Sequence, residues 1–145
     1  LVMDTYSFGY SSSGFTDMPM NHKVFLAQFD AIKKLASEGP CVMVGRCADY
    51  ALSEYKDCFS VFVHADTDWR INRLSQKHNK TAKEAKDMIN KTDKSRSSYY
   101  NYYTNKKWGA ASSYNLCVDS SKLGIDGAAK AIIQAIEIFD SIKNK

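Results

Sequence analysis

The chain has 145 residues, of which 44% are hydrophobic and 25% charged, and its formal net charge is +4. This length fits one domain with a buried core, and the mild positive charge favours anionic ligands without indicating a nucleic acid. No apolar run is long enough to cross a bilayer and no signal-peptide pattern is present, so we expect a cytoplasmic protein with no membrane partner.

The first predicted elements are an irregular segment, a helix and a strand. Residues 1–20 are rich in serine, glycine and aromatic residues and show no steady period, which predicts irregular structure. From Asn21, apolar residues recur at helical spacing until Gly39-Pro40, so a helix is expected to end there. The run CVMVG at 41–45 is short, apolar and β-branched, which indicates a buried parallel strand.

A second strand and two helices follow. The run FSVFVHA at 59–65 has the same strand character, and a helix is expected to start near Thr67. Thr81 precedes Glu84 by three residues, the spacing of a capping box. We therefore predict another helix through about Ile89 that continues into the tyrosine-rich segment.

The chain ends in a third strand and a last helix. NLCVDSS at 115–121 indicates the strand, and the helix is expected from about Ile125. Its apolar stripe consists of Ile132, Ile133, Ile136, Phe139 and Ile142. The crossovers are long enough for parallel pairing, so the order of elements predicts an α/β fold, an open parallel sheet covered by helices, in one domain spanning 1–145.

Cysteine and histidine carry no site in this prediction. The four cysteines are widely spaced and contain no C-x-x-C, which is typical of small buried side chains in a reducing compartment. The three histidines have no partner at zinc-ligand spacing. We therefore predict no metal-ligating residues.

Arginine is scarce, and this makes its positions informative. Sixteen of the twenty basic residues are lysines, and the arginines are Arg46, Arg70, Arg73 and Arg96. The planar guanidinium fork donates two parallel hydrogen bonds to a phosphate, whereas lysine offers a point charge. Arg46 follows a predicted strand by one residue, at the ligand-binding edge of an open sheet. This favours anion binding, and the alternative is a surface arginine in a loop.

The other arginines form helical pairs. Arg70 and Arg73 share one helix face, where the alternative to ligand binding is a solvated flank with a salt bridge to Asp66 or Asp68. Asp93 and the arginine three residues later form a second pair. An exposed ion pair would contribute little there, whereas a functional pair would hold ribose hydroxyls with its carboxylate and phosphate with its fork.

Aromatic rings crowd the segment 91–108, KTDKSRSSYYNYYTNKKW. They could stack on a base or pack against the sheet, and tyrosines at helical spacing more often pack. Rings interleaved with cations suit a flap, here about 67–108, that closes over a polyanion. Single-stranded RNA is a weaker alternative, because the net charge is modest and no RNP-like motif is present.

Five stretches together resemble a known family. They are YSFGYSSSGFTDMPMNHKVFLAQ, GPCVMVGRCADYAL, VFVHADTDWRINRL, KTDKSRSSYYNYYTNKKWG and NLCVDSSKLGI. The chain is similar to the cytidylate kinase-like proteins of bacteria, which are close to the cytidylate kinases among the P-loop nucleoside monophosphate kinases. The resemblance implies a P-loop kinase-like core with a helical lid, and transfer of a phosphoryl group from ATP with Mg²⁺ to a nucleotide such as CMP or dCMP.

The resemblance also implies roles for individual residues. Arg46 in GRCADY resembles the arginine that meets the phosphate of the acceptor. Arg70 and Arg73 resemble the catalytic arginines at the start of the lid, which also contact the donor. In DKSR, Asp93 and Arg96 resemble the pair that engages the acceptor and the transferring phosphates. Lys91 in the same segment is predicted to bind substrate as well.

One feature of the family has no counterpart in this sequence. No G-x-x-x-x-G-K-[ST] pattern is present, and the nearest stretch, SFGYSSSG, follows no predicted strand. Because the chain starts at Leu1, we expect the strand and phosphate loop to precede it, in which case the full-length protein is a kinase. The alternative is a catalytically inactive nucleotide-binding sensor domain. The acceptor base and the oligomeric state stay open, a homo-oligomer included.

Overall fold

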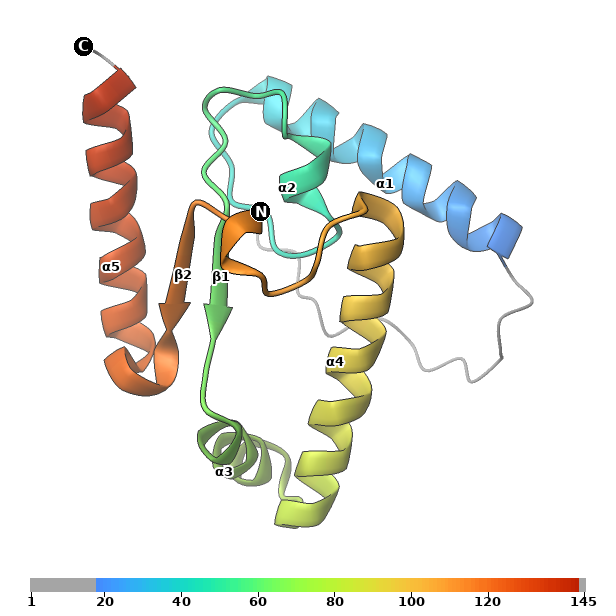
Figure 1. Ribbon diagram of the computed structural model, residues 1–145, viewed down its shortest axis with the longest axis vertical. Helices are drawn as coiled ribbons and strands as arrows, with labels where there is room; N and C mark the ends of the chain where they lie inside the picture. The colour runs from blue at the N-terminus through green and yellow to red at the C-terminus, as the bar shows by residue number, and fades with distance from the viewer. Residues whose placement is uncertain (1–17, 144–145) are drawn as a thin grey trace. The chain divides into compact units, whose positions relative to one another are not determined.

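The computed structural model describes residues 18–143 (Figure 1). Contacts within the chain divide it into two compact units, Leu1–Cys58 and Phe59–Lys145, and each is described by itself. Most of the irregular segment predicted for residues 1–20 lies outside the described residues. Its last three residues are helical, so the first helix begins earlier than predicted. No helix within 18–143 has the length and hydropathy to span a membrane.

The described part of the first unit, residues 18–58, contains two helices. Helix α1 spans Met18–Glu38 and ends at Gly39-Pro40 as predicted, and the short α2 spans Ala48–Ala51. They enclose a small apolar cluster, whose buried members are Ile32, Ala48, Ala51 and Leu52. The core of this unit is therefore small.

The predicted strand at 41–45 is wrong. These residues have no regular secondary structure, and Val42 and Val44 are 72% and 45% exposed. Met43 between them packs on the apolar cluster. A strand exists only through its hydrogen-bonded neighbour, and the described part of this unit, 18–58, contains no strand to pair with. The apolar pattern was therefore insufficient for the assignment.

The second unit contains a two-stranded parallel sheet. Strand β1 spans Val61–His64 and β2 spans Leu116–Asp119, with Val61 opposite Leu116 and His64 opposite Asp119. At the start of the pair, the Asn115 side chain accepts hydrogen bonds of 2.8 Å from both the N–H and the hydroxyl of Ser60. The other two predicted strands and their parallel pairing are confirmed, in a smaller sheet.

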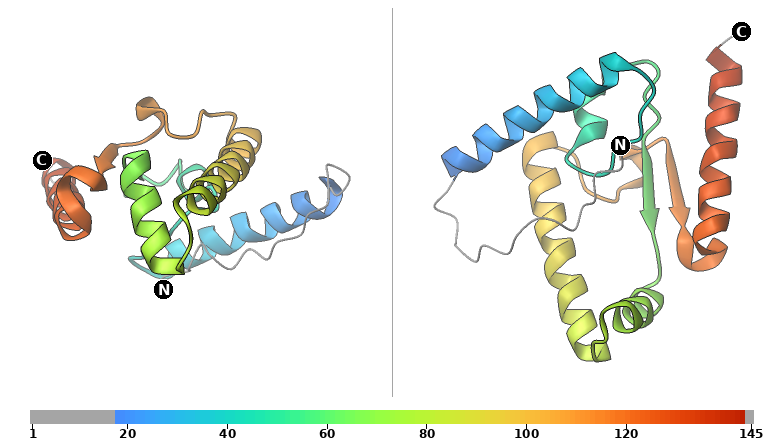
Figure 2. Two further views of the ribbon diagram at one scale, coloured as in Figure 1. Left: turned by 90° about the horizontal axis from the view of Figure 1, so that it is seen from below. Right: turned by 180° about the vertical axis from the view of Figure 1, so that it is seen from behind.

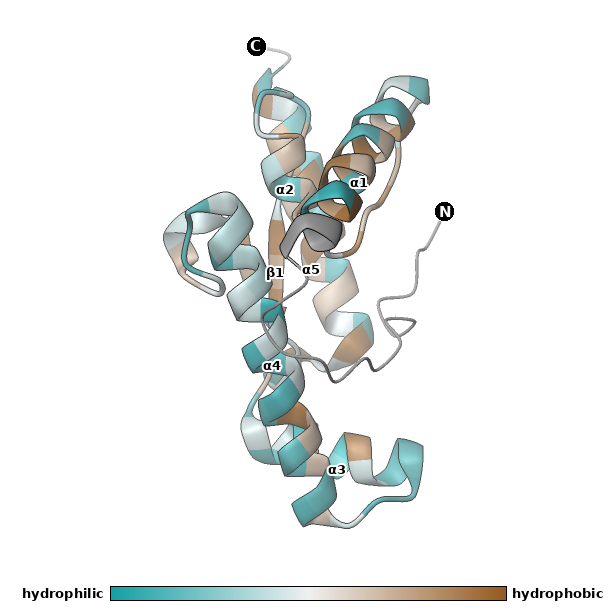
Figure 3. Cartoon of the chain, turned by 90° about the vertical axis from the view of Figure 1, so that its right-hand side faces the viewer, coloured by the Kyte–Doolittle hydropathy of each residue, from teal (hydrophilic) through white to brown (hydrophobic). Residues whose placement is uncertain are grey.

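Helices α3 and α4 form the crossover between the strands. Helix α3 spans Thr67–His78 and α4 spans Ala82–Thr104, and the two pack against each other. The predicted capping box is confirmed: the Glu84 N–H donates to Thr81 Oγ1 at 3.3 Å, and the Thr81 N–H donates to Glu84 Oε2 at 2.8 Å. Figure 3 colours both helices largely as hydrophilic and β1 as hydrophobic.

Helix α5, Ser120–Lys143, lies beside β2 (Figures 1 and 2). It is interrupted at Gly124, which has φ 68°, so its regular part begins at Ile125 as predicted. Phe139 packs on Phe59 with ring centroids 5.1 Å apart. Ile142 is 66% exposed, so the predicted apolar stripe is only partly covered by the described residues.

Candidate functional site

Three predicted site residues meet where α3 and α4 pack together. Arg70 lies in the first turn of α3, and Asp93 and Arg96 lie one turn apart on α4. Arg70 Nη1 is 2.7 Å from Asp93 Oδ2. Arg96 donates from Nη2 to the other carboxylate oxygen, Oδ1. Each oxygen of one carboxylate thus holds a different arginine, and the two cations converge from separate helices.

The cluster is accessible and positively charged. The side chains of Arg70, Asp93 and Arg96 are 29%, 24% and 45% exposed. Partial burial acts to raise the pKa of Asp93, but the hydrogen bonds and charges of the two arginines outweigh it and hold that pKa below its usual range. Asp93 is therefore ionised at neutral pH, and two guanidinium groups share its one negative charge. A second anion could use their remaining donors.

Arg96 has a further contact beyond its own helix. Its guanidinium carbon lies 5.1 Å from the ring centroid of Trp108, which places the cation over the ring face. Trp108 in turn meets Phe62 of β1 edge-on, with centroids 5.2 Å apart and the planes at 90°. This chain of contacts connects the α4 arginine to the sheet.

The tyrosines of α4 contact other aromatic rings. Tyr100 is buried and stacks on Tyr114 with centroids 6.1 Å apart. Tyr99 and Tyr102 both contact the ring of Tyr103, at 4.8 and 4.9 Å. Tyr102 is nevertheless 61% exposed. Packing accounts for the buried ring, whereas Tyr102 presents its ring to solvent.

Two other predicted residues make different contacts. Arg73 lies on α3 with its guanidinium 5.5 Å from the ring of Trp69, and its side chain is exposed. Lys91 is exposed on α4, two residues before Asp93. The salt bridge that the sequence allowed between Arg70 and Asp66 is replaced by the pair with Asp93.

Arg46 belongs to the first unit and has an unusual backbone. It has φ 57°, and it lies between Gly45 at φ 71° and Cys47 at φ 55°, so three consecutive residues are left-handed. For a residue other than glycine this conformation costs about 1–2 kcal/mol. The half-buried Arg46 lines a largely apolar cavity of about 240 Å³ between the end of α1 and residues 39–48. A strained turn thus positions a rare arginine.

The adjacent Cys47 is not a reactive group. Its side chain is buried, and burial, reinforced by the charge of Asp49, raises the pKa of its thiol to about 12. The thiol therefore stays protonated and acts as a small apolar side chain in the core. The prediction of buried cysteines is confirmed for Cys47 and wrong for Cys41, which is exposed.

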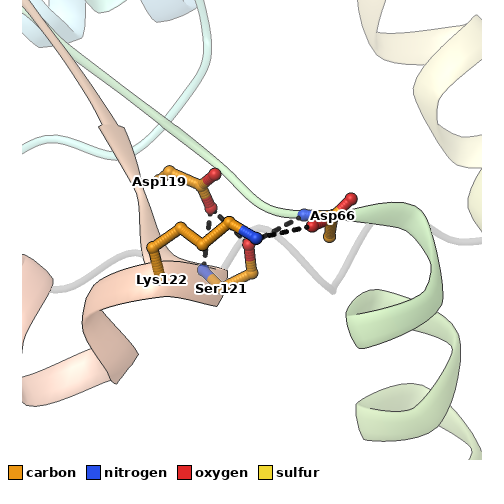
Figure 4. A network of polar contacts seen from close by, with 4 residues as sticks. All are labelled: Asp66, Asp119, Ser121 and Lys122. Atoms are coloured by element: carbon orange, nitrogen blue, oxygen red, sulfur yellow. Dashed lines mark hydrogen bonds and ion pairs between the residues drawn. The ribbon is translucent and has the colours of Figure 1, made fainter.

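A polar network at the ends of the two strands was not predicted (Figure 4). The Ser121 hydroxyl donates to Asp119 Oδ1 and accepts from the N–H of Asp66 at 3.2 Å. Lys122 Nζ donates to Asp66 Oδ2 at 3.3 Å. The hydrogen bonds from Ser121, aided by nearby charges, hold the pKa of Asp119 below its usual range.

This network connects the start of α5 with the start of α3. The signal in the sequence was the Asp-Ser-Ser that follows β2, because Asp and Ser at the end of a strand often cap the backbone of the next helix. By joining the two carboxyl ends of the strands, the network positions the helix that carries Arg70.

Both the fold and the sequence of the chain are similar to those of known proteins. A crystal structure of an uncharacterized protein from Eubacterium ventriosum ATCC 27560 is similar, with a TM-score of 0.77 and 33% identity over 81% of this chain and 74% of that chain. The search of curated proteins gave no match. The sequence model of the cytidylate kinase-like family matches residues 2–122.

Proposed function

Because the chain belongs to the cytidylate kinase-like family, we propose that the full-length protein transfers a phosphoryl group from ATP to a nucleoside monophosphate, with CMP or dCMP as acceptor. Such a transfer requires little covalent participation by the protein. Positioning the two nucleotides and neutralising charge on the moving phosphate supply most of the catalysis.

The observation that supports this proposal is the convergence of Arg70 and Arg96 on Asp93. One carboxylate contacts both forks, so the two guanidinium groups are already held close together before a ligand arrives. Preorganised donors need no rearrangement when charge develops in the transition state, and this makes them effective. A phosphoryl group carries several oxygens that can occupy the donors not taken by Asp93.

Each predicted residue has a role in this proposal. Arg70 and Arg96 contact the transferring phosphate, and Arg73 contacts the donor from the same face of α3. Arg46 binds the phosphate of the acceptor. Asp93 holds the two arginines and engages the ribose hydroxyls of the acceptor, while the exposed Lys91 adds positive charge beside it.

The proposal includes a magnesium ion that is bound together with the nucleotide. Within 18–143, no group of three or more His, Cys, Asp or Glu side chains is placed to hold a metal ion. Mg²⁺ is commonly held by one or two carboxylates together with substrate phosphates and water, so a protein-only cage is not required. When bound, the ion would neutralise phosphate charge, and the arginines of this chain would bind the remaining oxygens.

A coupled assay of ADP release tests the proposal. The full-length protein is supplied with ATP and Mg²⁺ and with CMP, dCMP, UMP or AMP, and turnover is expected to be fastest with CMP or dCMP. Arg96→Ala should lose this turnover. Lys94→Ala is its matched control, since it removes an exposed cation from the same helix, and it should keep the turnover. Nucleotide binding by calorimetry without turnover would favour the inactive binding domain. No turnover with any acceptor contradicts the kinase.

A further inference from the structure

We infer that Trp108 is a positioning residue whose ring holds the guanidinium of Arg96 in the orientation that meets nucleotide phosphate. This inference deepens the proposed function and rests on it. It assigns a task to a residue outside the helix that carries the arginine, and outside the group of residues predicted to touch phosphate.

Arg96 needs a second contact to be ordered. Its side chain is long and 45% exposed, and one ion pair at its tip leaves the plane of the guanidinium free to tilt. Asp93 fixes the position of one nitrogen, Nη2. The ring of Trp108, whose centroid lies 5.1 Å from the guanidinium carbon, gives a second contact from outside the helix. Two contacts restrict the orientation of the guanidinium more than one.

Trp108 itself is held in place. Its backbone N–H donates to Asn101 Oδ1 at 2.7 Å, and its ring lies edge-on against Phe62. The next residue, Gly109, has φ 76°, and a Cβ there would lie 3.2 Å from Phe62 Cζ. The positive φ and the close approach of this turn to Phe62 therefore both favour glycine. The ring is anchored to the sheet, and so is the arginine that lies on it.

This arrangement leaves Arg96 able to bind a ligand. The contact with the ring occupies none of the hydrogen-bond donors of the guanidinium. One donor is directed at Asp93, and the others stay available for phosphate oxygens. An ordered fork also loses less freedom when it binds, so the ring should improve both nucleotide binding and transition-state contact.

Kinetics of paired variants test the inference. Trp108→Leu removes the aromatic face, and kcat/KM should fall roughly tenfold, the size that a partly desolvated cation–π contact implies. Trp108→Phe keeps a face and should retain most activity. In an Arg96→Ala background, Trp108→Leu should cause no further loss. Phe139→Leu, which removes a ring that packs on Phe59, controls for a general loss of aromatic packing.

A spectroscopic measurement separates this inference from the proposed function. The Arg96 Nε–Hε resonance, assigned among the four arginines with Arg96→Lys, should be displaced by the ring current in the wild type and return toward random-coil values in Trp108→Leu. An unchanged resonance, or equal losses in both Arg96 backgrounds, overturns the positioning role. If the resonance is displaced but the protein shows no turnover, the proposed kinase function is overturned, while the contact between Arg96 and Trp108 is established.

Discussion

Arg70 of α3 and Asp93 of α4 form an ion pair of 2.7 Å that joins the two helices of the crossover. The same carboxylate also holds Arg96, so one acidic residue orders two cations from different helices. Partly exposed ion pairs contribute little to folding. The arrangement therefore predicts larger effects on activity than on stability.

Removing either arginine of this cluster should impair catalysis while preserving the fold. Arg70→Ala and Arg96→Ala are each expected to lower kcat/KM about 100-fold to 1,000-fold, the range for loss of one preorganised donor. The free energy of unfolding should change by less than about 1 kcal/mol. Steady-state kinetics and urea denaturation measure the two quantities. A loss of stability with unchanged kinetics would assign the cluster a structural role.

Arg46 allows a test in which stability and binding move in opposite directions. Arg46→Gly removes the side chain and relieves the left-handed backbone at φ 57°, so stability should stay constant or rise by up to about 1 kcal/mol. The KM for the acceptor should nevertheless increase. Arg46→Ala keeps the backbone strain and should show the same kinetic loss without the gain. If both variants use the acceptor normally, Arg46 does not bind it.

Acid stability should depend on Asp93. Its pKa lies below the ordinary value of 3.8, so its contribution to stability is fully present above that value and is lost as pH falls through the depressed folded pKa. In Asp93→Asn this part of the pH dependence should disappear. Denaturation midpoints followed from neutral pH to below pH 3.8 measure it. Asp87→Asn, an exposed position on the same helix, should leave the profile unchanged.

The capping box should contribute to stability independently of activity. Thr81→Ala removes the acceptor of the Glu84 N–H and should cost about 1 kcal/mol. Thr92→Ala, at an exposed position inside α4, should cost much less. Activity per folded molecule should be retained in both variants. A smaller loss for Thr81→Ala than for Thr92→Ala would show that the cap contributes nothing.

Local signals predicted the four long helices and two strands of this fold well, but not the short helix α2. The capping box, the Gly39-Pro40 stop and the period of the apolar residues are properties of neighbouring residues, and α1, α3 and α4 follow them. The strand predicted at 41–45 was wrong because a strand needs a hydrogen-bonded partner strand, and the apolar pattern carries no information about that partner. For the same reason, a local pattern cannot predict which side chains on two different helices will contact each other.

The candidate site shows the same limit. The pair of Asp93 and Arg96 follows from helical spacing alone. By contrast, Arg70 pairs with Asp93 rather than with its nearby acidic residues, because α3 and α4 pack against each other. The contact between Arg96 and Trp108 requires the chain to leave α4 at Asn105, which is left-handed, and turn back toward its own helix. Neither contact has a sequence period that could have revealed it.

The link between α3 and α4 has a mechanical consequence. Only residues 79–81 separate the two helices, and each of them is held: Asn79 is left-handed and donates to the Ser75 carbonyl, Lys80 donates to the same carbonyl at 3.1 Å, and Thr81 caps α4. Such a junction resists bending, so the helix pair should keep its internal geometry. The spacing between the paired guanidinium groups is then preserved, and the contact of Arg96 with Trp108 holds them in place relative to β1.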